Sequence, residues 1–213
     1  IDTGYMVPRA EQGSEIKTDL YYGGKVTGSG GGLHPAVYHQ GVLDRVKAAG
    51  IPVAGHTPVT AIAREGEGFE VTTTRGKIKA RNVAVMTNGY TPSAAQDLRR
   101  RLVPVGSYII ATEDIGEEKV TELFPNHRMI ADTKAILYYY RPSPDRKRII
   151  FGGRAKTRDV ETAESGRILH KFMCGVFPEL QDVKVTHSWT GNVAFAFDKL
   201  PHIGERDGIH YAL

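Results

Sequence analysis

The residues of this sequence that could do chemistry carry imidazole, thiol and guanidinium groups, but no set of them has the spacing of a complete catalytic motif. His34 and His39 are five residues apart and no His-Glu-x-x-His pattern occurs, so the eight histidines predict no metal site. No Gly-x-Ser-x-Gly elbow marks a serine nucleophile. The single cysteine, Cys174, lies in an apolar stretch, where we expect a small buried hydrophobic side chain. Spacing alone therefore assigns no catalytic residue.

A glycine-rich segment, Gly28–Gly32, has the setting of a phosphate-binding loop, because a strand is expected before it and a helix after it. A dinucleotide-binding fingerprint has the form Gly-x-Gly-x-x-Gly, and its sixth position is here Leu33. The Walker pattern also fails, since Lys25 is followed by Val26 instead of Ser or Thr. We therefore expect no free-standing phosphate loop at this segment.

The elements that must position these residues combine hairpin-connected strands with four helices, which predicts an α+β fold with a mixed, largely antiparallel sheet. Apolar spacing and stop signals predict helices over 35–49, 92–102, 117–124 and 160–176. Alternation and turn signals predict strands over 19–27, 51–54, 59–63, 69–74, 77–87, 103–112, 135–141, 148–153, 183–190, 194–197 and 209–213. The strands from 59 to 87 are expected to form an antiparallel meander.

Two of these elements carry specific expectations about burial. In the helix over 35–49, Tyr38, Val42 and Val46 recur at helical spacing and predict one apolar face. The strand over 77–87 ends in the near-continuous apolar stretch 83–86 (VAVM), and this end is expected to be buried on both faces.

The composition is ordinary for a globular protein and excludes several function classes. The chain has 213 residues, of which 40% are hydrophobic and 24% charged, with a net charge of +4. Its basic residues form only short clusters at 99–101 and 146–148, so no nucleic-acid partner is expected. No run approaches the roughly 18 apolar residues of a membrane span, and no signal peptide is visible, so we expect a cytoplasmic protein without a membrane span.

Four segments in order along the chain carry a family resemblance: 28–35 (GSGGGLHP) with 49–62 (AGIPVAGHTPVTAI) after the helix, 83–92 (VAVMTNGYTP), 138–154 (YYYRPSPDRKRIIFGGR) and 189–204 (WTGNVAFAFDKLPHIG). Together they resemble the FAD-dependent amine and amino-acid oxidoreductase family, which includes D-amino-acid oxidase, glycine oxidase and sarcosine oxidase. The His-Pro form of the first segment is most similar to the gamma-glutamylputrescine oxidase branch. Each segment alone is weak, but their order and spacing are specific.

The resemblance implies a substrate-domain sheet with flanking helices, plus part of an FAD-binding domain. We expect substrate-domain sequence over 1–34 and 93–188, FAD-domain sequence over 35–92, and a return towards the FAD domain over 189–213. In this family the Gly-x-Gly-x-x-Gly unit lies before the point that corresponds to Ile1, and a further loop follows the strand that corresponds to the last residues. The chain is therefore expected to be the middle of a longer protein.

The activity implied by the resemblance is the oxidation of a small-molecule amine or amino acid, in which a hydride passes to FAD, the imine hydrolyses and oxygen reoxidises the flavin. The segments that match the family's cofactor-binding stretches place Val59, Thr87, Asn88 and Gly89 at the FAD. No lysine matches the one that promotes the oxygen reaction in the sarcosine-oxidase branch, which leaves oxidase and dehydrogenase behaviour open. Oligomeric state is open as well.

Four residues are expected to line the substrate pocket: His34, Tyr139, Arg154 and Trp189. Aromatic rings attract ammonium groups, and an arginine can hold a carboxylate through two hydrogen bonds. Each residue has an alternative structural role, because His34 precedes a helix and can cap it, Arg154 can be a surface residue, and Trp189 can belong to the core. The tyrosines at 138–140 cannot all face a pocket, since strand residues alternate.

Other function classes remain open from the sequence. A non-catalytic substrate-binding or interaction module without flavin, or a nicotinamide-dependent dehydrogenase, would fit the same composition.

The 213-residue chain by itself is predicted to bind FAD weakly or not at all, because it contains no Gly-x-Gly-x-x-Gly loop to hold the pyrophosphate. The absorbance spectrum of the purified chain tests this prediction. A yellow product with one FAD per chain would contradict it.

Overall fold

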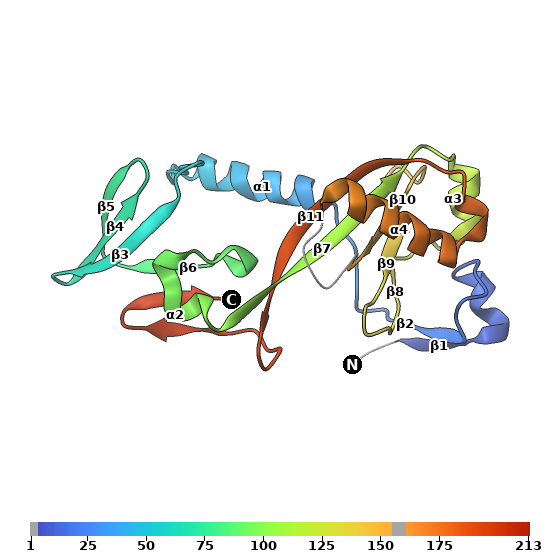
Figure 1. The fold of residues 1–213 in the computed structure, drawn as a ribbon, viewed down its shortest axis with the longest axis horizontal. Coiled ribbons are helices and arrows are strands. Elements are labelled where there is room, and N and C mark those ends of the chain that lie inside the picture. Colours follow the sequence, from blue (N-terminus) through green and yellow to red (C-terminus); the bar gives the residue numbers. More distant parts are fainter. Residues whose placement is uncertain (1–3, 155–160) are drawn as a thin grey trace. The chain divides into compact units, whose positions relative to one another are not determined.

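A computed structural model describes residues 4–154 and 161–213, which form two compact units (Figure 1). The first unit contains the described residues within 1–41 and 107–191, and the second contains residues 42–106 and 192–213. The chain passes from one unit to the other near residues 41, 106 and 191, whereas the boundaries expected from the sequence fall at 34, 92 and 188.

The first unit is built on a five-stranded sheet in the order β11-β7-β10-β9-β8. These strands are β7 (Leu102–Thr112), β8 (Ile130–Ala131), β9 (Tyr139–Pro142), β10 (Ile149–Gly153) and β11 (Val185–Ala196). β9 and β10 form the predicted hairpin, in which Phe151 lies opposite Tyr140, and on its other side Phe151 lies opposite Ile110 of β7. A small ribbon of β1 (Tyr5–Pro8) and β2 (Gly23–Val26), separated by a 3-10 helix (Arg9–Ser14), completes the unit together with two helices.

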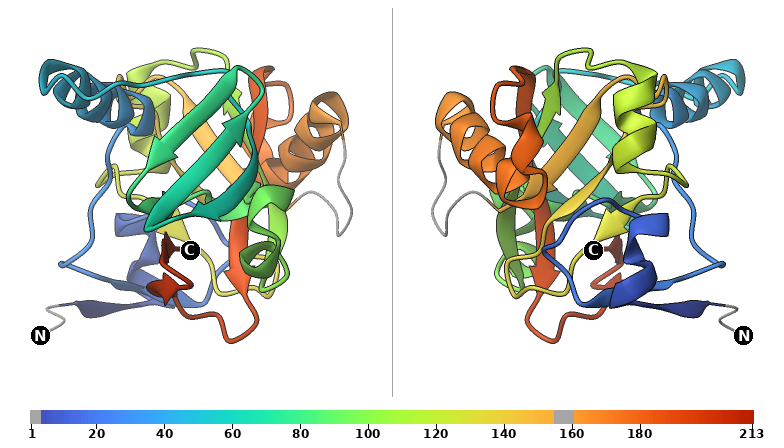
Figure 2. Two further views of the ribbon diagram at one scale, coloured as in Figure 1. Left: turned by 90° about the vertical axis from the view of Figure 1, so that its left-hand side faces the viewer. Right: turned by 90° about the vertical axis from the view of Figure 1, so that its right-hand side faces the viewer.

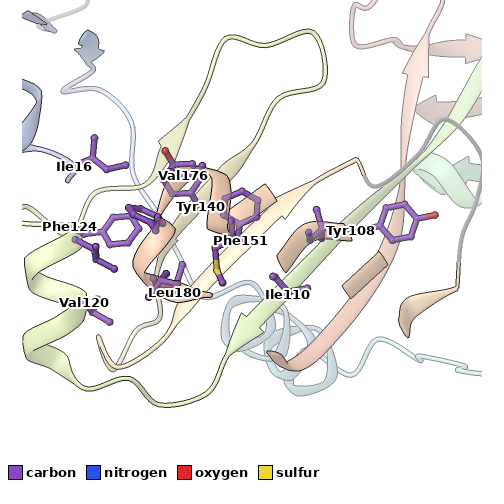
Figure 3. Close-up of a cluster of buried hydrophobic side chains, with 14 residues drawn as sticks. Ile16, Tyr108, Ile110, Val120, Phe124, Tyr140, Phe151, Val176 and Leu180 are labelled. Atoms are coloured by element: carbon purple, nitrogen blue, oxygen red, sulfur yellow. The ribbon is translucent and has the colours of Figure 1, made fainter. Parts of the chain in front are cut away.

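The core of this unit lies between one face of the sheet and the helices α3 (Glu117–Leu123) and α4 (Thr162–Val176). Phe151 is fully buried there, and its ring stacks on that of Tyr140 at a centroid distance of 5.2 Å (Figure 3). α4 contributes Leu169, Met173 and Val176, all without exposed surface. The apolar spacing that predicted helix 160–176 is therefore confirmed for its described part, and residue 160 lies outside the described residues.

The second unit contains two three-stranded sheets. The predicted antiparallel meander consists of β3 (Val59–Glu65), β4 (Gly68–Thr73) and β5 (Gly76–Ala80), which lie side by side in Figure 2. The other sheet has the order β12-β13-β6, from β6 (Val83–Val85), β12 (Ile203–Arg206) and β13 (Ile209–Ala212). Within it β6 and β13 run parallel.

Three predicted elements of this unit were wrong. The segment 51–54 forms no strand, since Pro52 lacks an N–H and both Ile51 and Val53 are more than half exposed. The predicted strand over 77–87 is broken into β5 and β6, because β6 leaves the meander to pair with β13; Met86 is 67% exposed, so this segment is not buried on both faces. The predicted helix over 92–102 is reduced to a 3-10 turn (Ser93–Ala95) and a single helical turn, α2 (Gln96–Arg99).

Other differences concern the extent of elements. The strand predicted over 19–27 is confined to β2, that over 135–141 to residues from Tyr139 onwards, and those over 183–190 and 194–197 are one continuous strand, β11. β1, β8 and β12 were not predicted. The helix α1 (Pro35–Ala48) forms as expected, but none of its residues is buried, and Tyr38 of its apolar face is 62% exposed.

Replacement of Phe151 by alanine is predicted to lower the free energy of unfolding by about 3–5 kcal/mol, because it removes a fully buried ring that stacks on Tyr140. Urea denaturation measures this loss. Phe197 is 78% exposed and provides the control, for which Phe197→Ala should change the free energy by about 0.5 kcal/mol or less. Equal losses in the two variants would contradict the assignment of the core.

Candidate active site

The face of the five-stranded sheet that points away from α4 carries a candidate substrate surface. Because strand residues alternate between faces, the neighbours of the buried residues Tyr108, Tyr140 and Phe151 lie on the opposite face. Tyr139 lies opposite Gly152 in the β9–β10 register, and a Cβ at Gly152 would overlap the tyrosine ring. The Tyr139 hydroxyl makes a hydrogen bond with the Ser107 hydroxyl of β7. The ring of Tyr139 therefore lies across the sheet over Gly152.

The environment of Tyr139 keeps its hydroxyl protonated. Burial raises the pKa of the Tyr139 phenol above its ordinary value because it penalises the phenolate, and the hydrogen bond with Ser107 offsets only part of this effect. At neutral pH the side chain is thus a neutral ring with one hydroxyl group already engaged on the sheet.

Trp189 lies on the same face of the sheet. Its neighbour Ser188 donates a hydrogen bond to the Thr162 carbonyl in α4, so Ser188 faces the helix and Trp189 faces away from it. The next residue, Thr190, donates a hydrogen bond of 3.0 Å to the Ser107 carbonyl. Trp189 is 42% exposed and does not belong to the hydrophobic core. Alternation therefore assigns two of the four predicted substrate residues, Tyr139 and Trp189, to one face of the sheet.

The glycine-rich segment is tied to this sheet by a residue that the sequence analysis missed. Arg141 of β9 donates a hydrogen bond of 3.0 Å to the Leu33 carbonyl. A Cβ at Gly32 would lie 2.5 Å from Met129 Sδ, so the segment packs closely beside β8. Because strand residues alternate between the two faces of a sheet, Arg141 is expected on the same face as Tyr139. This spacing was the sequence signal that could have identified Arg141.

His34 follows directly after this tether and caps α1. Its Nδ1 accepts a hydrogen bond of 3.4 Å from the Val37 N–H, and its carbonyl accepts one from Tyr38. The structure thus gives His34 the capping role that the sequence left as an alternative, while its exposed ring still presents Nε2. Arg154 follows directly after β10, at the end of the strand where Gly153 lies opposite Tyr108, and is half-buried.

Three of the four predicted cofactor residues form one turn in the second unit. Asn88 has a positive φ of 46°, and its Oδ1 accepts hydrogen bonds from the N–H of Gly89 (2.7 Å) and of Ala194 in β11 (2.8 Å). The Tyr90 hydroxyl accepts one of 2.9 Å from the Asn192 N–H. A Cβ at Gly89 would lie 2.7 Å from the Asn192 carbonyl oxygen, so this contact requires glycine. We call residues 87–91 the β11 clamp.

The β11 clamp begins just after β6, at the carboxyl end of a strand that pairs in parallel with β13. In open sheets with parallel strands, ligands bind outside the carboxyl ends. Asn88 Oδ1, the Gly89 N–H and the carbonyl oxygens of Thr87 and Asn88 are already engaged within the clamp, whereas the Asn88 Nδ2 group makes none of these bonds. Val59 lies elsewhere, half-buried at the start of β3 and opposite Thr73 in a different sheet.

Two further side chains with reactive groups, Cys174 and Asp198, lie in surroundings that favour a structural role. Cys174 is half-buried, and burial raises the pKa of its thiol, which disfavours the reactive thiolate. Asp198 accepts a hydrogen bond from the Leu200 N–H in a turn, and its pairing with His202 lowers the pKa of its carboxyl group. Within 4–154 and 161–213, no three His, Cys, Asp or Glu side chains are grouped as a metal site. No helix in those residues is long and apolar enough to cross a membrane.

Replacement of Asn88 by alanine is predicted to lower the free energy of unfolding by about 1–2 kcal/mol, because two backbone N–H groups lose their acceptor and alanine is strained at positive φ. Asn88→Asp keeps an acceptor oxygen and tolerates this backbone conformation, so it should retain most of the stability. Thermal unfolding of the two variants is the measurement, and equal midpoints would contradict the role given to the clamp.

Comparison with known proteins identifies the family of the chain. The family model described as FAD dependent oxidoreductase (DAO) matches residues 3–213. The chain is 30% identical over 201 residues to gamma-glutamylputrescine oxidoreductase of Escherichia coli (strain K12), a match that covers 92% of this chain and 46% of that protein. It is 29% identical over 193 residues to the probable oxidoreductase OrdL of Haemophilus influenzae, covering 89% and 44%. The chain spans about half the length of the curated relatives it matches.

Solved structures share the fold. L-proline dehydrogenase from P. horikoshii matches with a TM-score of 0.78 at 19% identity, over 98% of this chain and 58% of that one. Glycine oxidase from Geobacillus kaustophilus matches with a TM-score of 0.78 at 18% identity, over 99% and 57%. The mixed, largely antiparallel architecture expected from the sequence is confirmed, and so is the resemblance carried by the four segments. The chain belongs to the FAD-dependent oxidoreductase (DAO) family.

Proposed function

We propose that the full-length protein containing this chain oxidises a primary or secondary amine or an amino acid, with hydride transfer from the carbon next to the nitrogen. The observation that carries the proposal is the open sheet face of the first unit. Tyr139, which is hydrogen-bonded to Ser107, and Trp189 are assigned to that face by alternation, in a chain of an FAD-dependent family.

We assign the contacts that this chain makes with FAD to the second unit. FAD, when bound, supplies the hydride acceptor and passes the electrons on to oxygen. The position of the β11 clamp at the carboxyl end of β6 fits such a group, because ligands of open sheets bind outside the carboxyl ends of parallel strands. We assign the contacts to Thr87, Asn88 and Gly89, and keep Val59 as a fourth contact on the strength of the sequence resemblance alone.

We assign the contacts that this chain makes with the substrate to the sheet face of the first unit. The rings of Tyr139 and Trp189 provide apolar walls whose π faces attract a substrate ammonium before it loses its proton. We assign Arg154 the role of holding a substrate carboxylate, and the His34 ring edge that of accepting or donating one hydrogen bond. Ser107 orients Tyr139 without contacting the substrate.

The names of the relatives supply the first substrates to test. One relative is a gamma-glutamylputrescine oxidoreductase, and structures with the same fold are a glycine oxidase and an L-proline dehydrogenase. A glutamylated diamine, glycine and L-proline therefore cover an amine, a primary amino acid and a secondary amino acid.

Oxygen consumption by the full-length protein with these three compounds tests the proposal. Tyr139→Ala is expected to lower kcat/KM about three- to thirtyfold, the equivalent of a ring-face interaction of about 0.7–2 kcal/mol. Tyr139→Phe keeps the ring and should lose little. Tyr22, which is 83% exposed in the same unit, gives the matched control Tyr22→Ala, with activity unchanged.

The outcomes separate the alternatives. Reduction of a dye without oxygen consumption would assign a dehydrogenase within the same proposal. A full-length protein that binds no flavin and turns over none of the three compounds would overturn the proposal and favour a non-catalytic binding module.

A further inference from the structure

A pocket of about 450 Å³ lies within the first unit, lined by residues of the first half of α4 and of the edge strand β11 with the residues just before it. Its polar wall consists of Arg167, His170, Thr186, His187 and Ser188. None of these residues is used by the proposed oxidation.

Hydrogen bonds at both ends hold the walls of this pocket in place. At one end the Ser188 hydroxyl donates to the Thr162 carbonyl in the first turn of α4, over 3.0 Å. At the other end His170 Nε2 donates to the Val183 carbonyl over 2.9 Å. Between them Gly166 is buried against Ser188, since a Cβ there would lie 3.4 Å from the serine oxygen. The helix and the strand are thus fastened on each side of the cavity.

The internal hydrogen bonds also determine what the pocket presents to a ligand. The Thr186 hydroxyl donates to the Thr112 carbonyl, so it accepts from His187 Nδ1 and leaves His187 Nε2 without a partner among the described residues. The Arg167 guanidinium forms no ion pair or hydrogen bond within the described part of the chain. No Asp or Glu is among the described residues that line the pocket. The described lining therefore contributes one guanidinium group and one imidazole nitrogen, both on exposed residues and without partners there, and no carboxylate.

We propose that this pocket binds a small oxyanion, namely the phosphate or carboxylate group of a metabolite. A guanidinium recognises such groups through paired N–H donors, and a protonated imidazole adds one further donor. The first turn of α4 lines the same pocket and contributes the positive end of a 15-residue helix. A divalent cation is the wrong ligand here, because Arg167 would repel it and His170 Nε2 already donates its proton to a carbonyl.

Titration of the full-length protein with inorganic phosphate, and separately with succinate, tests the proposal by following the imidazole proton signals in NMR spectra and the heat of binding. Sodium chloride at matched ionic strength is the reference. We expect saturable binding of at least one probe, with the His187 signals shifting. Arg167→Gln should weaken that binding about tenfold, the effect of losing one charge-assisted hydrogen bond. Binding of only phosphate or only succinate would identify which oxyanion the pocket takes.

Lys171 offers a matched control, because it is exposed on α4 as Arg167 is but lies outside the pocket, and Lys171→Gln removes the same charge from the same helix. That variant should bind the probe within about twofold of the parent protein. Equal weakening by both substitutions would overturn the proposal, since it would indicate a general field effect. The absence of saturable binding by either probe, or an equal response to chloride, would overturn it as well. Neither substitution touches the proposed oxidation, so oxygen consumption with amines serves as an independent check of folding.

Discussion

The burial of one face of the five-stranded sheet beneath α4 is the constraint on which the first unit depends. Phe151 stacks on Tyr140 in that layer, and both are opposite partners in the β9–β10 register. Because side chains alternate along a strand, placing these two inside places Tyr139 and Gly152 outside. A shift of the register by one residue would exchange core and substrate face together. The same strand register thus determines both the stability of the buried layer and the composition of the candidate site.

In the second unit the main constraint is different: the turn at 87–91 must be held beside β6, a strand in a parallel pair. β6 has only three residues, and a strand that short gains little from its own ladder. The turn that follows it is fixed instead by side chain to backbone bonds, from Asn88 to Ala194 and from Tyr90 to Asn192. The N–H groups of this part of β11 therefore have partners without a neighbouring strand. Asn88 and Gly89 are explained by this arrangement before any cofactor is considered.

The sequence predicted those elements whose own residues decide their structure, and failed where a distant partner decides. The β9–β10 hairpin and the α4 helix follow from local alternation and helical spacing, so both could be found. β6 could not be separated from the meander, because its partner β13 lies at the other end of the chain. The site divides in the same way. Tyr139 could be proposed from its type, but its orientation needed Gly152 and Ser107 from two other strands.

The Phe-Gly-Gly run at 151–153 was part of the family resemblance, and the structure supplies a physical reason for its first two residues. Phe151 fills the core, while Gly152 lies on the opposite face beneath the Tyr139 ring, where any Cβ would overlap the aromatic carbons. Gly153 is different, because a Cβ there would meet its neighbours at ordinary contact distances of 3.4–3.5 Å. The first glycine is therefore required by the tyrosine rather than by backbone conformation. The pair Tyr139 and Gly152 must change together or not at all, which makes the ring over the sheet a property of the fold as much as of the site.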